Sequence, residues 1–356
     1  MNNSSSAFPT TNNIDLLRLF AALQVVIIHM SEHLLHASRS DNFALMMLSY
    51  IPGVPVFFFM SGLLIPRSYS RASSIREYIF NRVLRLYPAL LVCIGLTVLM
   101  LISIGYMGFG DLFIPKVSAW LITQSTVLQF YNPDFFYNFG TGVINGSLWT
   151  ISVEVQFYIM TPLLVILLRH KSLYFALFVL SVIANIAFQQ FDLRELLLGK
   201  FLRVSFLPWI FMFMTGQLVY VYWSNISRFF TGKSLFWIAL AAFQTILLIL
   251  VEKKTNYSFS GNSILPITFF VLAGLVLALA LNRPRTAKKV LKGNDISYGI
   301  YIYHMPIINL FIYLAIPVTI FSAIGAIGIV FAIAYLSWIL IERPALRLKK
   351  TSILPR

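Results

Sequence analysis

The segment IDLLRLFAALQVVIIHMSEHLL, residues 14–35, is a long apolar run in which an arginine and a histidine stand at helical spacing. Arg18 and His29 are eleven residues apart, which at about 100° per residue makes three turns plus about 20°. In a helix the two side chains would share a face, about 16 Å apart along the axis. Charged and titratable groups are costly in a bilayer unless they face protein or water. We therefore expect this face to look into a polar interior.

The composition assigns the whole chain to a membrane. Of its 356 residues 59% are hydrophobic and only 11% are charged, against about 25% charged in soluble domains. The mean hydropathy is +0.82. The net charge of +15 comes from basic connections between apolar segments, which is typical of membrane proteins, so we expect no nucleic-acid partner. The single cysteine, Cys93, lies in an apolar segment and is expected to be a buried, inert thiol.

Ten apolar segments are long enough to cross a bilayer, at roughly 20 residues each. They are 14–36, 44–65, 80–104, 147–168, 173–188, 204–223, 234–251, 264–281, 296–313 and 317–341. We predict an all-α, polytopic membrane protein with about ten transmembrane helices around a central polar cavity. It would comprise a polar N-terminal tail (1–13), a transmembrane domain (14–342) and a basic cytoplasmic tail (343–356).

Lysine and arginine indicate the orientation, because cytoplasmic connections carry an excess of these residues. With the N-terminus in the cytoplasm, the inner connections and the C-terminal tail hold most of the basic residues. Both termini are therefore predicted to be cytoplasmic. The long connection 105–146 would lie outside, where it could cap the mouth of a cavity.

His29 and Glu154 lie deep in their segments. Glu154 is about seven residues, or about 10 Å, into the segment that begins at Ser147, and His29 is at a comparable depth. A carboxylate can fix the tautomer of an imidazole and raise its pKa, so the two could form a catalytic pair. Each could instead be a structural group that a neighbouring helix satisfies. His33 and His36 follow at the outer end, where polar residues meet headgroups, and we expect no metal site.

Two further motifs carry polar groups at the ends of apolar segments. Arg82 and Arg85 in FNRVLRLYP (80–88) would share a face at the cytoplasmic mouth. Two guanidinium groups at this spacing suit a phosphate, or simply anchor the helix inside. His304 in ISYGIYIYH (296–304) is surrounded by tyrosines, which fits either a direct role or one buried polar contact.

Together these motifs resemble the acyltransferase-3 family of integral membrane acyltransferases. The matching segments follow the family order: the Arg18-x10-His29 pair, VPVFFFMSG (54–62), FNRVLRLYP (80–88), GSLWTISVEVQFY (146–158), ISYGIYIYH (296–304) and Glu342-Arg343-Pro344. Two departures are mild. Pro55 stands where an acidic or polar residue is common, and Thr150-Ile151 where a Ser-Leu pair is usual. We expect the stand-alone form, without the extracytoplasmic esterase-like domain of some members.

The resemblance implies an O-acyltransferase of the bacterial inner membrane that moves an acyl group, commonly acetyl, from cytoplasmic acyl-CoA to a hydroxyl of an envelope glycan or lipid-linked glycan. Lipopolysaccharide O-antigen sugar is the first acceptor that we expect. Acetyl-CoA would be a co-substrate, and no permanently bound cofactor is expected. The resemblance makes His29 and Glu154 the catalytic candidates and Arg18, Arg82 and Arg85 the acyl-CoA-binding candidates. Candidates for contacting the acceptor or the developing oxyanion are Ser147, Trp149, Ser152, Tyr158 and His304.

A carrier is the alternative. A transporter or flippase for a glycan or lipid-linked intermediate would also use intramembrane arginine, histidine and glutamate. Label from acyl-CoA in the acceptor would distinguish the enzyme from the carrier. The acyl chain length, the oligomeric state and the choice between direct transfer and an acyl-histidine intermediate stay open at this point.

Overall fold

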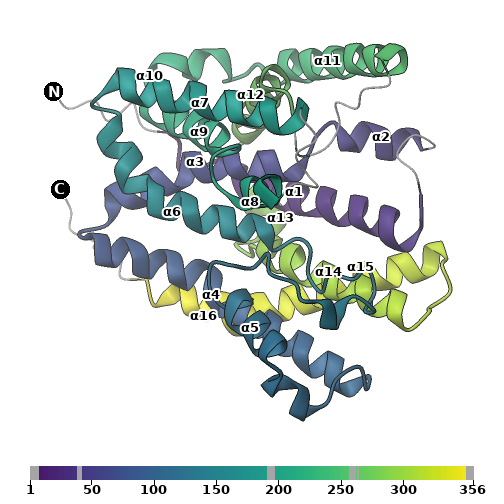
Figure 1. Cartoon of the computed structure of the whole chain (residues 1–356). Helices are drawn as coiled ribbons and strands as arrows, with labels where there is room; N and C mark the ends of the chain where they lie inside the picture. Colours follow the sequence, from purple (N-terminus) through teal and green to yellow (C-terminus); the bar gives the residue numbers. More distant parts are fainter. Residues whose placement is uncertain (1–7, 38–41, 191–196, 256–261, 263, 350–356) are drawn as a thin grey trace. The chain divides into compact units, whose positions relative to one another are not determined.

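The computed structural model describes residues 8–37, 42–190, 197–255, 262 and 264–349. Every regular element in these residues is helical, and they contain no strand (Figure 1). The all-α prediction is therefore confirmed.

The chain divides into two compact units, each assembled from three segments. Unit 1 comprises residues 1–25, 39–70 and 156–295, and unit 2 comprises residues 26–38, 71–155 and 296–356. The division passes through α1 (Ile14–His29). Arg18 and His29 thus lie on one continuous helix, as the spacing predicts, but belong to different units.

Unit 1 contains the first part of α1, most of α6 (Trp149–Leu167) and the helices of its segments 39–70 and 156–295. These are α2 (Phe43–Ser49), α3 (Gly53–Arg71), α7 (Lys171–Gln190), α8 (Leu197–Val204), α9 (Ile210–Val221), α10 (Trp223–Ile226), α11 (Ser234–Thr255), α12 (Pro266–Leu281) and α13 (Thr286–Leu291). Helix α11 packs against α12, and α7 packs against α8 and α9. Helices α3 and α9 approach so closely that a Cβ on Gly62 would lie 1.9 Å from the carbonyl oxygen of Phe213. Glycine is needed there because the two backbones touch.

The expected span 44–65 is two helices, because proline interrupts it. Pro52 lacks a backbone N–H and disfavours the helical conformation of the residue before it, so α2 ends before α3 begins. Gln24 of α1 satisfies the backbone groups exposed by the break. Its Nε2 donates to the carbonyl of Leu48 at 3.1 Å, and its Oε1 accepts from the N–H of Gly53 at 2.7 Å.

The expected span 204–223 is likewise shortened, to the 12 residues of α9. Pro208 precedes that helix, and two polar residues of α7 bind the irregular backbone around it. Ser181 donates to the carbonyl of Leu207 at 2.7 Å, and Asn185 donates to the carbonyl of Pro208 at 3.0 Å. Both side chains are fully buried. Polar residues within an apolar helix thus compensate a non-helical turn.

Unit 2 is organised around α14 (Ser297–Tyr313), which packs against α15 (Ile320–Ser337), α4 (Ile75–Ser103) and the π-helical turn η1 (Met30–Leu34). Helices α14 and α15 lie side by side in Figure 1. The remaining elements are η2 (Phe109–Phe113), α5 (Pro115–Gln124), η3 (Asp134–Phe136), the start of α6, the π-helical turn η6 (Trp338–Glu342) and α16 (Arg343–Arg347).

The long connection 105–146 has an apolar core of its own, built from residues such as Met107, Val117, Trp120, Phe136 and Phe139. Asn309 of α14, which is fully buried, holds this connection. Its Nδ2 donates to the carbonyls of Val143 and Ile144, and its Oδ1 accepts from the N–H of Thr141. The connection is therefore bound to α14. Its position over the mouth of a cavity stays a prediction.

Seven helical stretches of the described residues are long and apolar enough to cross a membrane: 14–34, 43–71, 75–103, 149–167, 171–188, 234–254 and 320–347. Helices α9, α12 and α14 are shorter, with 12, 16 and 17 residues. The count of ten spans, the central polar cavity and the cytoplasmic termini stay predictions.

Candidate active site

The two histidines of unit 2 that lie deepest in apolar segments are in contact. His29 is the last residue of α1 and is half-buried, while His304 in the middle of α14 is fully buried. Nδ1 of His29 lies 2.9 Å from Nε2 of His304, and the ring centroids are 5.2 Å apart at an interplanar angle of 28°. The chain after His29 winds into a π-helical turn, a distortion that is frequent at functional sites.

The backbone fixes where the protons of this pair lie. Nδ1 of His304 is 2.7 Å from the carbonyl oxygen of Tyr301. A carbonyl oxygen can only accept, so this Nδ1 carries the hydrogen. In a neutral His304 the Nε2 atom is then the acceptor, and His29 donates to it through Nδ1. The lone pair of the neutral His29 is therefore on its Nε2 atom.

Tyr301 also links this turn of α14 to the start of α6. Its hydroxyl donates to the carbonyl of Ser147 at 3.2 Å and lies 2.8 Å from Oγ1 of Thr150. Ser147 is buried and donates to Oδ1 of Asn145 at 2.7 Å, and Nδ2 of Asn145 donates to the carbonyl of Ile302 at 2.8 Å. Hydrogen bonds from three residues of the 145–150 segment thus hold the turn before His304.

The other candidates from the SLWTISVEVQFY motif have different surroundings. Trp149 and Glu154 are half-buried. Glu154 is four residues after Thr150, so the two share the face of α6 that reaches Tyr301. Ser152 is fully buried and donates to Oε1 of Gln129 at 2.6 Å, so it helps to hold the connection 105–146. Tyr158 is buried and belongs to unit 1. The pairing of His29 with Glu154 stays a prediction.

The candidate arginines belong to both units. Arg82 and Arg85 are half-buried on α4 in unit 2. The next residue, Leu86, accepts a hydrogen bond at 3.1 Å from the hydroxyl of Tyr298 in the first turns of α14. Arg18 in unit 1 donates to Asp295 at 2.9 Å and lies 3.9 Å from Asp15. Their role in binding acyl-CoA stays a prediction.

Glu342, in the last of the matching motifs, is a buried carboxylate within a continuing helical run. The helical run continues through η6 and α16 to Arg347, because Pro344 lies in the first turn of α16, where its missing N–H is not needed. The side chain of Glu342 is 2% exposed. Ser337 donates to Glu342 at 3.4 Å and accepts from the hydroxyl of Tyr303 on α14 at 3.2 Å. The sequence feature that could have predicted a buried Glu342 is a carboxylate inside an apolar segment.

Comparison with known proteins shows the family of the chain. The profile of the acyltransferase-3 family, described as an acyltransferase domain, matches residues 11–342. The chain belongs to the acyltransferase-3 family. This family membership confirms the resemblance carried by the Arg18–His29 pair and the five later motifs. The matched range includes His29, His304 and all the arginine candidates.

Similar proteins include a nodulation protein and two O-acetyltransferases. Nodulation protein 10 of Rhizobium leguminosarum bv. viciae is 33% identical over 97% of the chain and 95% of that protein. The O-acetyl transferase of Shigella phage Sf6 is 25% identical, over 94% of the chain and 95% of that protein. The O-acetyltransferase OatA of Staphylococcus aureus (strain NCTC 8325 / PS 47) is 25% identical over 83% of the chain and 50% of that protein. No solved structure matches the chain. Family, relatives and apolar helices together support a membrane O-acyltransferase.

Proposed function

We propose that this family member transfers an acetyl group from acetyl-CoA to a hydroxyl of an envelope glycan in the bacterial inner membrane. Two of the relatives are named O-acetyltransferases, which favours an acetyl group and an oxygen acceptor. Lipopolysaccharide O-antigen sugar is the acceptor that we propose first. An exported glycan is a second acceptor class to include in the assay.

The hydrogen-bonded pair of His29 and His304 carries the proposal. A general base for acyl transfer needs a lone pair within reach of the attacking hydroxyl. The carbonyl of Tyr301 orients His304, and His304 in turn places the lone pair of the neutral His29 on Nε2. The arrangement supplies a base together with a group that orients it, as nucleophile activation requires.

In the proposed reaction, His29 takes the proton of the acceptor hydroxyl on Nε2. The hydroxyl oxygen attacks the thioester carbonyl and forms the new O–C bond, and the C–S bond breaks as the tetrahedral intermediate collapses. The imidazolium of His29 then returns the proton to the leaving thiolate, which departs as CoA. His304 stabilises the imidazolium by accepting from its Nδ1–H. A donor for the oxyanion is also required, and Trp149 is one candidate near the start of α6.

The donor would approach from the cytoplasmic side. Arg82 and Arg85 lie one turn apart on α4, and each guanidinium can give a phosphate two hydrogen bonds. The thin, mostly uncharged pantetheine arm of acetyl-CoA could then extend into the membrane domain toward His29. Arg18 is about 16 Å along α1 from His29, a span that such an arm can cover.

The experiment uses cells with and without the protein and analyses their envelope glycans by mass spectrometry. We expect acetyl esters on the glycan of cells that contain the wild-type protein and none with His29→Ala at equal membrane abundance. Purified protein with radiolabelled acetyl-CoA and isolated glycan then tests the carrier alternative. Label in the glycan excludes a carrier without chemistry, whereas unlabelled glycan with intact protein would refute the proposal.

A further inference from the structure

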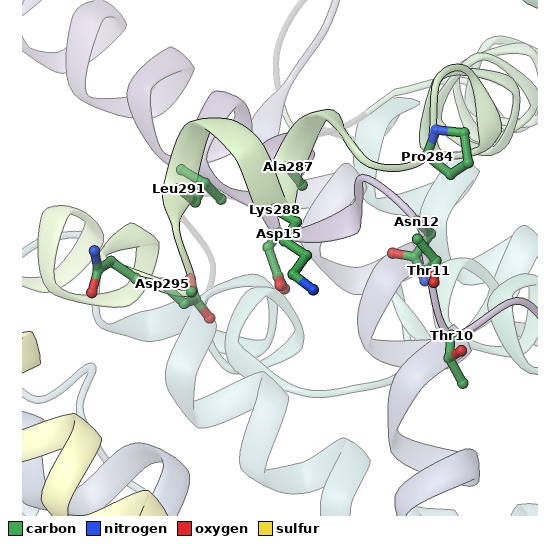
Figure 2. Close-up of a pocket in the computed structure, with 11 residues that line it drawn as sticks. Thr10, Thr11, Asn12, Asp15, Pro284, Ala287, Lys288, Leu291 and Asp295 are labelled. Atoms are coloured by element: carbon green, nitrogen blue, oxygen red, sulfur yellow. The ribbon is translucent and has the colours of Figure 1, made fainter.

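A pocket of about 240 Å³ lies in unit 1, between the residues before α1 and the connection 282–295 (Figure 2). Figure 2 shows α13 along one wall and residues 10–15 along the other, with the side chains of Asp15 and Lys288 between them. The pocket has a mixed lining: Leu291 and Ala287 are apolar, Thr11 and Asn294 are polar, and Asp15 and Asp295 are acidic.

The walls of this pocket are fixed to each other by one buried residue. Asn13 is 5% exposed. Its Nδ2 donates to the carbonyl of Asn282 at 2.6 Å, and its Oδ1 accepts from the N–H of Ala287 at 2.9 Å. Its own N–H donates to the carbonyl of Ala280 at 2.8 Å. The pocket therefore exists before any ligand binds, as is usual for small-molecule sites.

A left-handed turn closes the far side of the pocket. Lys292 has φ of +50° and Gly293 has φ of +83°, a conformation that glycine adopts without steric cost. The turn returns the chain to Asp295, where the guanidinium of Arg18 binds the carboxylate at 2.9 Å. Arg18 thus holds an acidic residue of the pocket lining in place.

The distribution of charge indicates the class of ligand. The acidic residues in the lining are acceptors for hydroxyl or amine hydrogens, and the apolar residues offer contact to a flat ring. The exposed cation Lys288 also lines the pocket, and the same connection carries further exposed cations: Arg283, Arg285, Lys289 and Lys292. Cations of this kind bind phosphate groups. An uncharged base and ribose attached to phosphates would match both regions.

We propose that this pocket binds the nucleotide end of the acyl-CoA donor, the adenosine 3′,5′-bisphosphate portion. The single free ribose hydroxyl, the 2′-OH, or the adenine amine meets Asp15 or Asp295, the base contacts Leu291, and the 3′-phosphate meets Lys288 and the neighbouring cations. Arg18 acts by positioning Asp295 rather than by contacting a phosphate. This inference rests on the proposed function, because it takes acyl-CoA as the donor.

The test measures binding to the purified full-length protein by isothermal titration calorimetry. The probes are adenosine 3′,5′-bisphosphate, CoA, ADP and pantetheine, which lacks the nucleotide. Leu291→Trp fills the pocket, and Val290→Trp is the matched control, because Val290 is its neighbour on α13, is 60% exposed and does not line the pocket. We expect Leu291→Trp to weaken binding of the bisphosphate and of CoA at least about tenfold. Val290→Trp should bind both as the wild type does.

Several outcomes would overturn the assignment: no binding of the bisphosphate by the wild type, unchanged binding by Leu291→Trp, or tighter binding of ADP than of CoA. The last result would mean a site for a free nucleotide. If Leu291→Trp fails to fold, Lys288→Glu at an exposed position takes its place. It should weaken the bisphosphate at least about fivefold, and unchanged affinity would be equally decisive against the site.

A transfer assay separates this inference from the proposed function. The wild type should prefer acetyl-CoA to acetyl-pantetheine in kcat/KM, and Leu291→Trp should lose most of that preference while Val290→Trp keeps it. Transfer with an unchanged preference in Leu291→Trp contradicts the pocket but leaves the enzyme assignment intact. Absence of transfer from either donor by the wild type contradicts the proposed function. The calorimetric binding of the bisphosphate and of CoA then remains as the test of the pocket.

Discussion

Nδ1 of His29 lies 2.9 Å from Nε2 of His304, and the carbonyl of Tyr301 determines the direction of the hydrogen bond between them. This relationship gives the two histidines different roles. His29 is half-buried, whereas His304 is fully buried and bound to the carbonyl of Tyr301 through Nδ1. In our account His29 is the base and His304 is a positioning residue.

The first prediction concerns His304. His304→Leu removes the acceptor for Nδ1 of His29, so we expect kcat to fall about 10- to 100-fold, as for other residues that orient a functional imidazole. KM for acetyl-CoA should not change, because His304 does not touch the donor. Steady-state kinetics with the purified variant measure both values.

His304→Gln is the matched control, because its amide oxygen can accept from Nδ1 of His29. It should retain more activity than His304→Leu. Equal losses in the two variants, or a change confined to KM, would show that His304 has a packing role instead.

The second prediction compares Glu154 with His304. We propose that His304, which contacts Nδ1 of His29, orients the imidazole more strongly than Glu154, which shares a face of α6 with Thr150 and its contact to Tyr301. We expect Glu154→Gln to lower kcat about tenfold, less than His304→Leu. Steady-state measurements of kcat for the two variants, made in parallel, show which residue contributes more. An inactive Glu154→Gln beside a fully active His304→Leu would identify the carboxylate, and not His304, as the group that orients His29.

The comparison of His29 with its neighbours shows what could be predicted from the sequence. Helical periodicity placed Arg18 and His29 on one helix, and the cost of burying them marked the face as functional. Depth along a helix, however, does not say which helix lies opposite. Glu154 and His304 were both compatible with His29, and the contact with His304 becomes visible only through the packing of α14 against η1.

The third prediction concerns the ion pair between Arg18 and Asp295. The two side chains are 21% and 13% exposed, so solvent screens the pair only in part. A double-mutant cycle with Arg18→Gln and Asp295→Asn should give a coupling of about 1 kcal/mol in the free energy of unfolding. Chemical denaturation in detergent measures it. Strictly additive losses would mean that the pair contributes nothing and that Arg18 does not hold Asp295.

The pocket beside this ion pair was not predictable. The connection 282–295 is rich in lysine and arginine, which the positive-inside rule explains without any site. Its walls meet only because Asn13 bonds to residues more than 260 positions away, a contact that no local pattern encodes. The shortening of α9 was not predictable for a similar reason. Hydropathy contains no information about the hydrogen bonds that Ser181 and Asn185 make to the backbone around Pro208.

The fourth prediction tests the close contact of α3 and α9. Gly62→Ala would place a Cβ 1.9 Å from the carbonyl oxygen of Phe213, so the helices must separate. We expect a loss of about 1 to 3 kcal/mol in the free energy of unfolding. Gly95→Ala on α4 is the control, because nothing lies within 4 Å of its Cβ, and it should be neutral or slightly stabilising. A thermal unfolding series in detergent compares them, and equal stability of both variants would contradict the close packing.

The central claim is that His29 is the base of an acetyl-transfer reaction, and one measurement tests it most directly. Purified wild type and His29→Ala, matched for folding by their thermal unfolding, are incubated with radiolabelled acetyl-CoA and isolated O-antigen polysaccharide, and the rate of label transfer is recorded. We expect the wild type to acetylate the glycan and His29→Ala to be slower by about 10²- to 10⁴-fold. Transfer by His29→Ala at the wild-type rate would contradict the account.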